Sequence, residues 1–441
     1  MGAPEPGRGS RDEGASAPAA ASPGGQAAPH AGHVDRKSRD SARVPAGDRG
    51  RVAAVHAQAR ATLRFALAFM LAAPISAVVP HDTGAWLPLH LFLVGGVLSA
   101  ISGATQLLAV TWSSAPAPRP GLASLQRWLL AIGAAGLALA RELDAGSVAT
   151  AVAGAAVITG LAVLAGLLLR IRSGAVVDRF TPAIDGYVLA IVLGILGSAG
   201  GIVLATGRVH RDHGEVRSVH VIVNLLGLVG LVIAATLPFF VATQVRARMS
   251  PRATPVAVRS VVLAMATAVV AAAGATLLDV RVGTTVALGG YALGVVALFA
   301  FVPPVGRRQL TWAGPRVVQL CSGVLWWAAA TGMLAASLGG GDGVPDGAVL
   351  ALVVGGYAQI VVASLAYFGP VLRGGGHVAL TAGFGITRSW LSVVVGNLAA
   401  VAALLGWHVM LGALFGIWML DLGFRAVLLH RGLDSTEDPA S

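Results

Sequence analysis

The stretch RSVHVIVNLLGLVGLVIAATLPFFVATQVRARMSPR, residues 217–252, decides the fold class of this chain. It has no charged side chain between Arg217 and Arg246, and this run exceeds the roughly 20 apolar residues that cross the hydrocarbon core of a bilayer. The stretch therefore predicts a membrane-spanning helix. His220 and Asn224 lie four residues apart near its start, so on a helix both project from one face. Polar groups inside a membrane need partners, which makes both residues candidates for a binding site.

The composition extends this interpretation to most of the chain. Of its 441 residues, 56% are apolar and only 12% are charged, and the mean hydropathy is +0.77. Such values exclude an ordinary soluble globular protein and predict an all-α, polytopic membrane bundle whose main partner is the lipid bilayer. The net charge of +11 does not indicate nucleic-acid binding, because the arginines gather at the ends of apolar segments and in the first 64 residues.

The chain divides into two tails and a membrane domain. Residues 1–58 are rich in Gly, Ala, Pro, Ser and Arg, so we expect a disordered, basic tail without a signal peptide. A second short tail is expected at 431–441. The domain between them, 59–430, holds twelve apolar segments. The spans are predicted at 61–80, 85–112, 121–141, 147–170, 182–206, 218–245, 254–278, 283–305, 314–338, 347–372, 387–406 and 408–428.

The distribution of basic residues predicts the orientation. Lys37 is the only lysine among the 31 basic residues, a bias that suggests a GC-rich bacterial genome. With twelve spans, 26 basic residues fall on the side of the N-terminus and five on the other. Since cytoplasmic loops carry the excess of Lys and Arg, we expect a bacterial plasma-membrane protein with both termini in the cytoplasm. The five residues on the outer side are Arg141, Arg208, Arg211, Arg217 and Arg281.

Two further stretches echo residues 217–252 at a spacing of about 130 residues. They are LHLFLVGGVLSAISGATQLLAVTW (89–112) and VLALVVGGYAQIVVASLAYFGPVL (349–372), and they fall on the second and tenth spans. The echo predicts a threefold repeat of four helices, and the alternative is a coincidence between Ala- and Gly-rich segments. Gly96, Gly227 and Gly356 align within one residue, and the repeats would cover residues 60–180, 181–312 and 313–430.

Histidines form the most informative polar pattern. His90 and His220 are equivalent under the repeat and lie on the outer half of spans 2 and 6. Paired imidazoles on facing helices hold haem or copper in helical bundles, whereas the simpler alternative is two interfacial histidines bonded to backbone or water. Gln359 is the most conspicuous polar group of span 10. The candidate cofactor site therefore comprises His90, His220, Asn224 and Gln359.

The outer loop RVHRDHGEVRSVH, residues 208–220, is a second candidate. Together with His220, His210 and His213 could bind copper or zinc, since imidazole is a common ligand of both metals. A solvated polar loop is the alternative, because the spacing matches no established metal motif and three arginines in the loop repel cations. Cys321 is the only cysteine, so a disulfide or a cysteine metal cluster within one chain is excluded.

Ionisable residues are nearly absent from the centres of the spans. Asp185, Asp421 and Arg425 lie near cytoplasmic ends, and the last two are spaced for an i, i+4 ion pair. This pattern argues against a proton-coupled transporter. The remaining transport hypothesis is a small-molecule carrier that works through neutral groups, although such amides also form hydrogen bonds between packed helices. The amides in question are Gln106, Asn224, Gln359 and Asn397.

Twelve helices in three groups of four, with a histidine on the outer half of spans 2 and 6, resemble subunit I of haem-copper oxidases and the NnrS-type haem and copper membrane proteins. Residues 220–249 and 355–376 are also similar to stretches of an uncharacterised bacterial membrane-protein family labelled copper oxidase-like. By this resemblance His90 corresponds to a ligand of the low-spin haem, and His220 corresponds to a copper ligand.

The chain departs from the oxidase pattern in three places. Span 10 has no His-x-His motif, span 7 has no histidine pair, and Asn224 stands where a tyrosine follows the copper ligand. The resemblance therefore implies a haem- or copper-associated redox accessory protein with a possible redox partner protein. It does not imply an oxygen-reducing enzyme.

Overall fold

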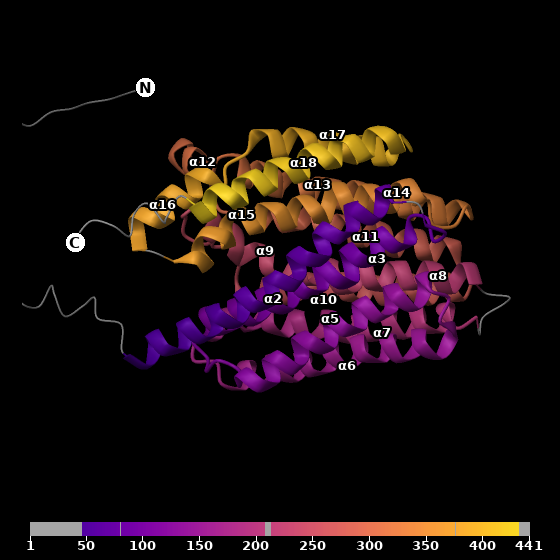
Figure 1. Ribbon diagram of the computed structural model, residues 1–441, viewed down its shortest axis with the longest axis horizontal. Helices are drawn as coiled ribbons and strands as arrows, with labels where there is room; N and C mark the ends of the chain where they lie inside the picture. Colours follow the sequence, from indigo (N-terminus) through magenta and orange to yellow (C-terminus); the bar gives the residue numbers. More distant parts are fainter. Residues whose placement is uncertain (1–45, 80, 208–212, 375, 432–441) are drawn as a thin grey trace, which may run out of the picture. The chain divides into compact units, whose positions relative to one another are not determined.

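The computed structural model describes residues 46–79, 81–207, 213–374 and 376–431, with the backbone alone for 46–49. The chain divides into two units at Ala46, and everything below concerns the second unit, which starts at Gly47. Nearly all described residues are helical and none forms a strand, so the predicted all-α class is confirmed (Figure 1). The outer His210 lies outside the described residues. So do residues 1–45 of the predicted N-terminal tail and residues 432–441 of the predicted C-terminal tail.

The helices follow one another with short connections. Several begin at a proline, which suits the first helical turn because its missing N–H would have no partner there. In chain order they are α2 (Ala46–Val78), α3 (Trp86–His90), η1 (Leu91–Val97), α4 (Leu98–Ser113), α5 (Pro120–Glu142), α6 (Gly146–Ser173), η2 (Asp178–Phe180), α7 (Thr181–Ala205), α8 (His213–Val221), η3 (Ile222–Gly230), α9 (Leu231–Gln244), α10 (Pro255–Leu277), α11 (Arg281–Ala297), η4 (Leu298–Phe301), α12 (Arg307–Ala313), α13 (Pro315–Gly340), α14 (Asp346–Leu350), η5 (Ala351–Ala358), α15 (Gln359–Arg373), α16 (Gly376–Ile386), α17 (Trp390–Leu404) and α18 (His408–Arg431).

Eleven helices of the described residues are long and apolar enough to cross a membrane. The count becomes twelve if α16 and α17, which meet at an angle of 43°, are one broken span. The predicted span 387–406 coincides with α17, which passes as a membrane span only together with α16. Ser389 caps the start of α17 by accepting a hydrogen bond from the Ser392 N–H. By itself α17 is about 22 Å long, shorter than the hydrocarbon core of about 30 Å.

The first helix starts earlier than the sequence pattern predicts. Disorder is expected up to residue 58, but α2 is helical from Ala46 onward, so the boundary of the predicted tail is wrong. The segment from Arg51 to Arg60 contains four Ala, two Arg and one Gln, all of which have high helix propensity. Its contacts also hold it in place, because Gln58 donates a hydrogen bond to the Pro118 carbonyl.

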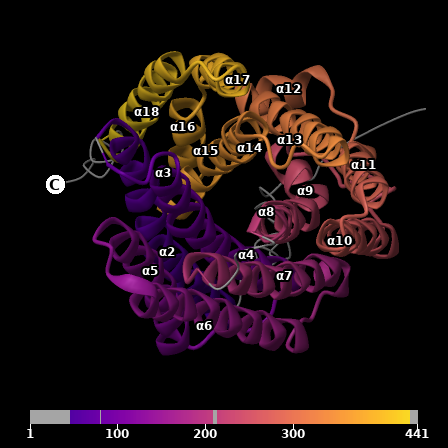
Figure 2. The ribbon, with the colours of Figure 1, turned by 90° about the vertical axis from the view of Figure 1, so that its right-hand side faces the viewer.

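Three spans form the centre of the bundle, and they are the three that the sequence aligns. The apolar 18-residue stretches of spans 2, 6 and 10 are 72%, 89% and 72% buried, whereas the corresponding stretch of no other long span exceeds 50%. Figure 2 shows these helices in the middle of the bundle. These central spans contact one another through aromatic rings. Trp112 packs against Phe239 at 5.6 Å between ring centroids, and Phe240 packs against Phe368 at 5.2 Å.

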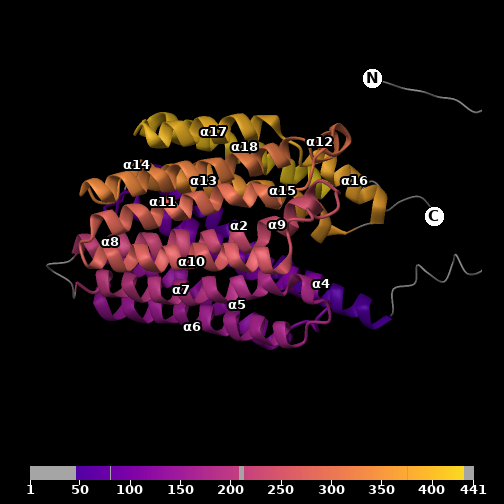
Figure 3. The same cartoon turned by 180° about the vertical axis from the view of Figure 1, so that it is seen from behind.

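The two ends of the bundle differ in charge. Arg60 donates to the Leu372 carbonyl and Arg373 to the His430 carbonyl, so the start of α2 and the ends of α15 and α18 lie at one end. We call this the arginine-rich end, and Figure 3 shows α12 and α16 there as well. The predicted pair of Asp421 and Arg425 is confirmed at 2.9 Å.

The outer helices present apolar side chains to the surroundings. Only 6% of the apolar 18-residue stretch of α18 is buried. On this helix Val409, Leu420 and Phe424 are 90%, 75% and 63% exposed. An apolar helix surface of this size is stable in lipid rather than in water. The chain is therefore a multi-pass membrane protein.

Candidate functional site

Each of the three central spans contains a π-helical segment. The segments η1, η3 and η5 include the aligned glycines Gly96, Gly227 and Gly356. Their occurrence at equivalent places is informative because π-helical turns are rare and often mark functional sites. His90 immediately precedes η1, and His220 lies two residues before η3. The threefold repeat stays a prediction, but the candidate histidines lie beside its shared irregular backbone.

Two buried tyrosines bond to the carbonyls of η3. The Tyr291 hydroxyl donates to the Leu226 carbonyl at 2.7 Å, and the Tyr357 hydroxyl donates to the Leu225 carbonyl at 2.7 Å. Both tyrosines are 0% exposed. Because an unpaired carbonyl in the membrane interior is costly, these bonds stabilise the irregular segment. Sequence reasoning missed both residues, although a tyrosine in mid-span usually requires a hydrogen-bond partner.

We expect Tyr291→Phe and Tyr357→Phe each to lower the free energy of unfolding by about 0.6 kcal/mol, and by no more than about 1.7 kcal/mol. The loss arises because one carbonyl of η3 is left without its partner. Thermal unfolding in detergent measures the effect. Tyr367→Phe is the control, since the Tyr367 hydroxyl makes no hydrogen bond with a described residue. Equal losses in all three variants would show that the carbonyl bonds have no specific effect.

His220 is held against α7. Its Nδ1 atom lies 2.8 Å from the Gly197 carbonyl, and Asn224 Nδ2 lies 3.2 Å from the same Nδ1. A carbonyl only accepts, so the imidazole proton is on Nδ1 and the Asn224 amide donates to the His220 carbonyl at 2.9 Å. Glycine is required opposite the ring, because a Cβ at Gly201 would lie 2.6 Å from the His220 Cε1 atom.

His90 is held by its own helix. Its Nδ1 atom lies 2.8 Å from the Trp86 carbonyl, and its ring stacks on the Trp86 ring with centroids 4.0 Å apart. The Arg141 guanidinium, at the end of α5, lies 6.0 Å from the same indole. The backbone carbonyl again places the proton on Nδ1. The short helix α3 and the indole therefore fix the orientation of this imidazole.

Both imidazoles consequently have an Nε2 atom with a free lone pair. Neither Nε2 accepts a hydrogen bond from the residues that the structure describes, and both side chains are half-buried. Histidines that ligate metals usually donate the other ring N–H to a backbone carbonyl or carboxylate, which fixes the tautomer and the ring.

The two amides of the candidate site have their own partners. Asn224 bonds to the His220 backbone, as described above, and therefore lies beside the imidazole. Gln359 is 0% exposed and donates to the Gly355 carbonyl at 3.0 Å, while its Oε1 atom accepts from Asn397 at 3.5 Å. Asn397 in turn accepts from Trp326. None of these bonds connects Gln359 to the histidines, so its visible role is helix packing.

The outer-loop candidate receives only a partial description. His213 is exposed at the first residue of α8, and His210 lies outside the described residues. Among the residues that are described, no three His, Cys, Asp or Glu side chains are grouped so as to hold a metal ion. A loop site involving His210 stays a prediction.

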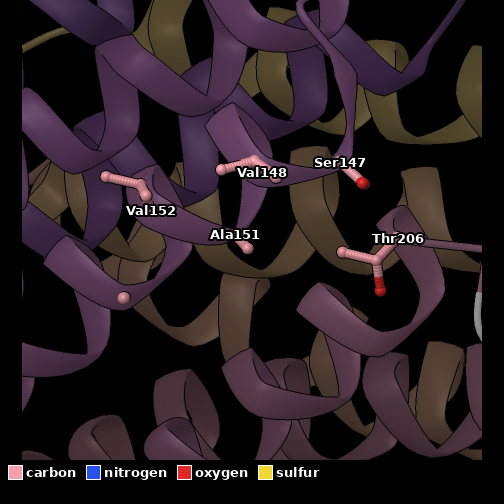
Figure 4. A pocket seen from close by; sticks show the side chains of 6 residues that line it. Ser147, Val148, Ala151, Val152 and Thr206 are labelled. Carbon is pink, nitrogen blue, oxygen red and sulfur yellow. The ribbon is translucent and has the colours of Figure 1, made fainter.

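Two surface hollows lie away from the histidines. One, of about 290 Å³, is lined by small side chains of α6 with Thr206 opposite, and Figure 4 shows Val148, Ala151 and Val152 there. The other, of about 230 Å³, lies at the arginine-rich end between the 116–119 connection and α6. Neither contains a candidate ligand, so the histidine pair is the better candidate site.

Comparisons of the chain with protein-family models, with curated proteins and with solved structures find no match. The class of the protein, a multi-pass helical membrane protein, therefore rests on its fold, and its function must be inferred from the site.

Proposed function

We propose that this protein binds haem between His90 and His220 and serves as an accessory to membrane electron transfer. The observation that supports the proposal is the position of each Nδ1 atom 2.8 Å from a backbone carbonyl, which fixes the tautomer of the imidazole. Each donates Nδ1–H to a backbone carbonyl, Trp86 for one and Gly197 for the other, and keeps the Nε2 lone pair free. Two such imidazoles from different spans are a suitable pair of axial ligands for haem iron.

The number of ligands favours haem over copper. Copper in proteins usually takes three or more ligands from His, Cys, Met or carboxylate side chains, whereas haem iron needs two axial ligands and takes the rest from its own ring. The described residues offer no group of three His, Cys, Asp or Glu side chains. Haem would supply one-electron transfer, while the protein would hold both rings, fix their tautomers and exclude water.

Oxygen reduction is not part of the proposal. The chain has Asn224 where the oxidase pattern has a tyrosine, and no histidine pair stands in span 7 or span 10. A redox partner protein would be needed to exchange electrons with the bound haem. The carrier hypothesis stays a prediction, and no specific contact favours it.

Optical spectroscopy tests the proposal. The full chain should be purified in detergent from cells supplied with a haem precursor and with copper. We expect a Soret band and about one haem per chain, with copper well below stoichiometric. Stoichiometric copper without haem would refute the choice of cofactor, and the absence of both in repeated preparations would refute the function.

We further propose that the arginine-rich end faces the cytoplasm of a bacterial cell, because basic loops are retained on that side. Reporter fusions at Ser441 and in the connection at His210 test the orientation. The first fusion should report the cytoplasm and the second the outside. An external report from Ser441 would mean that the number of spans is odd or that the orientation is reversed.

A further inference from the structure

Three arginines gather around one tryptophan at the arginine-rich end. The Arg246 Cζ atom lies 3.3 Å from the centroid of the Trp312 ring, and the Arg388 Cζ atom lies 5.8 Å from it. Arg388 and Arg316 also both donate hydrogen bonds to the Trp312 carbonyl. These residues come from the end of α9, from α13, and from the α16–α17 connection. We call Arg246, Arg316 and Arg388 the arginine cluster.

The cluster has no countercharge in the described part of the chain. No carboxylate there lies within 4.0 Å of its guanidinium groups, and Arg246 and Arg388 both repel Arg316. The nearby Asp421 is already bound by Arg425 at 2.9 Å and by Ser389 at 2.5 Å. Like charges held together at a partly buried place destabilise the protein unless an anion binds between them.

The unpaired groups of this region are all donors. Arg316 is 1% exposed, and its Nη1 atom is buried without a hydrogen-bond partner, although its other nitrogens donate to the Ala313 and Trp312 carbonyls. Arg388 Nε and Trp312 Nε1 are buried and unpaired as well. Buried donors are normally satisfied, so the missing partner is an acceptor.

The cluster is open on one side. Arg246 is exposed, Trp312 and Arg388 are half-buried, and Arg316 lies deepest, with the Phe384 ring 4.6 Å from its Cζ atom. Arg246 is therefore the member of the cluster that an anion meets first. The helices α12 and α16 beside it lie at the arginine-rich end of the bundle (Figure 3). In a membrane protein the ends of the bundle meet the phospholipid headgroups.

We propose that the arginine cluster binds a phosphate group. Guanidinium forks match phosphate oxygens, and three of them brought together from α13 and from two connections suit a tetrahedral anion better than a planar carboxylate. The phosphate can belong to an anionic phospholipid headgroup or to a soluble phosphate compound. Basic pockets at the cytoplasmic ends of membrane helices bind anionic headgroups in the same way.

The test uses the full chain and two probes. Delipidated protein in detergent is titrated with inorganic phosphate, and protein in nanodiscs of phosphatidylcholine is compared with protein in nanodiscs that also contain phosphatidylglycerol. Native mass spectrometry counts bound phosphate or lipid. Arg246→Gln and Arg388→Gln should each weaken binding about tenfold or more. Arg248→Gln removes the same charge from an exposed neighbour outside the cluster and should change binding by less than about twofold.

The outcomes separate the two sources. Retention of phosphatidylglycerol without binding of inorganic phosphate identifies a lipid headgroup, and binding of inorganic phosphate in detergent identifies a soluble ligand. Either result supports the proposal if the Arg246→Gln variant no longer binds the same probe. The proposal is overturned if the wild-type protein binds neither probe, or if Arg246→Gln and Arg248→Gln behave alike. Arg246 is exposed, so its variant should elute from a sizing column as the wild type does.

Discussion

Purified His90→Ala and His220→Ala proteins should contain no haem while remaining folded. Each substitution removes one of the two proposed axial ligands, and no group of three His, Cys, Asp or Glu among the described residues offers a replacement, so the haem should be lost during purification. The bundle should tolerate the change, because a polar contact in a membrane contributes about 0.6 kcal/mol on average. Haem content per chain is measured from the Soret band and the protein concentration.

His408→Ala is the matched control for these variants. His408 starts α18 at the same end of the bundle as His90 and His220, but it is exposed and does not belong to the central spans. Its replacement should leave haem content unchanged. Wild-type haem content in both His90→Ala and His220→Ala would exclude the pair as ligands and with it the proposed site.

The packing of the central spans gives the largest expected effect on stability. A Cβ at Gly323 of α13 would lie 2.9 Å from the Gly356 carbonyl and 2.7 Å from the Ile360 Cγ1 atom. Gly323→Leu must therefore push α13 away from η5, and overpacking of this kind costs about 1–3 kcal/mol. We expect a clear fall in the thermal unfolding temperature, or loss of the folded protein during purification.

Gly332→Leu tests whether this effect is specific to the contact. Gly332 lies on the same helix and is exposed, and a Cβ at this position would meet no described atom within 4 Å. The leucine would face lipid, so stability should change by no more than about 0.5 kcal/mol. If the Gly323 and Gly332 variants were equally unstable, the cause would be the loss of glycine from α13 rather than its approach to η5.

Segment length and charge predicted most of the fold. The apolar run from Ser218 to Val245 and its two echoes were predicted as spans, and the structure adds that these three are the most buried ones of the bundle. The predicted span 387–406 starts beside the break between α16 and α17, but helix α16 itself was not predicted, because residues 373–386 were assigned to the connection after span 10. Only the cap at Ser389 and the packing of α17 decide where the helix bends.

The residues of the candidate site came from the sequence, and their contacts come from the structure. The spacing of His90 and His220 singled out both residues, and their depth follows from their places near the starts of spans 2 and 6. Their carbonyl partners could not be predicted, because the bond to Gly197 depends on how closely α7 approaches. Gln359 was included for its polarity alone, and the structure gives it partners in packing instead.

The arginine cluster shows why pattern analysis misses such sites. Its members are separated by about 70 residues in the chain, and each stands near the end of an apolar segment, where the charge rule for membrane orientation already explains an arginine. Only the folded helices bring the three side chains to Trp312. In the sequence alone, the cluster shows only as Trp312 four residues before Arg316, at the start of a span. This pattern is too common to be informative.

Electron paramagnetic resonance of the oxidised, purified protein tests the histidine pair most directly, because the spectrum of ferric haem reports the axial ligands. We predict a low-spin signal of haem with two imidazole ligands, and its loss in both His90→Ala and His220→Ala. A high-spin signal, a signal that survives both substitutions, or the absence of haem from the wild-type protein would contradict the assignment of His90 and His220 as its ligands.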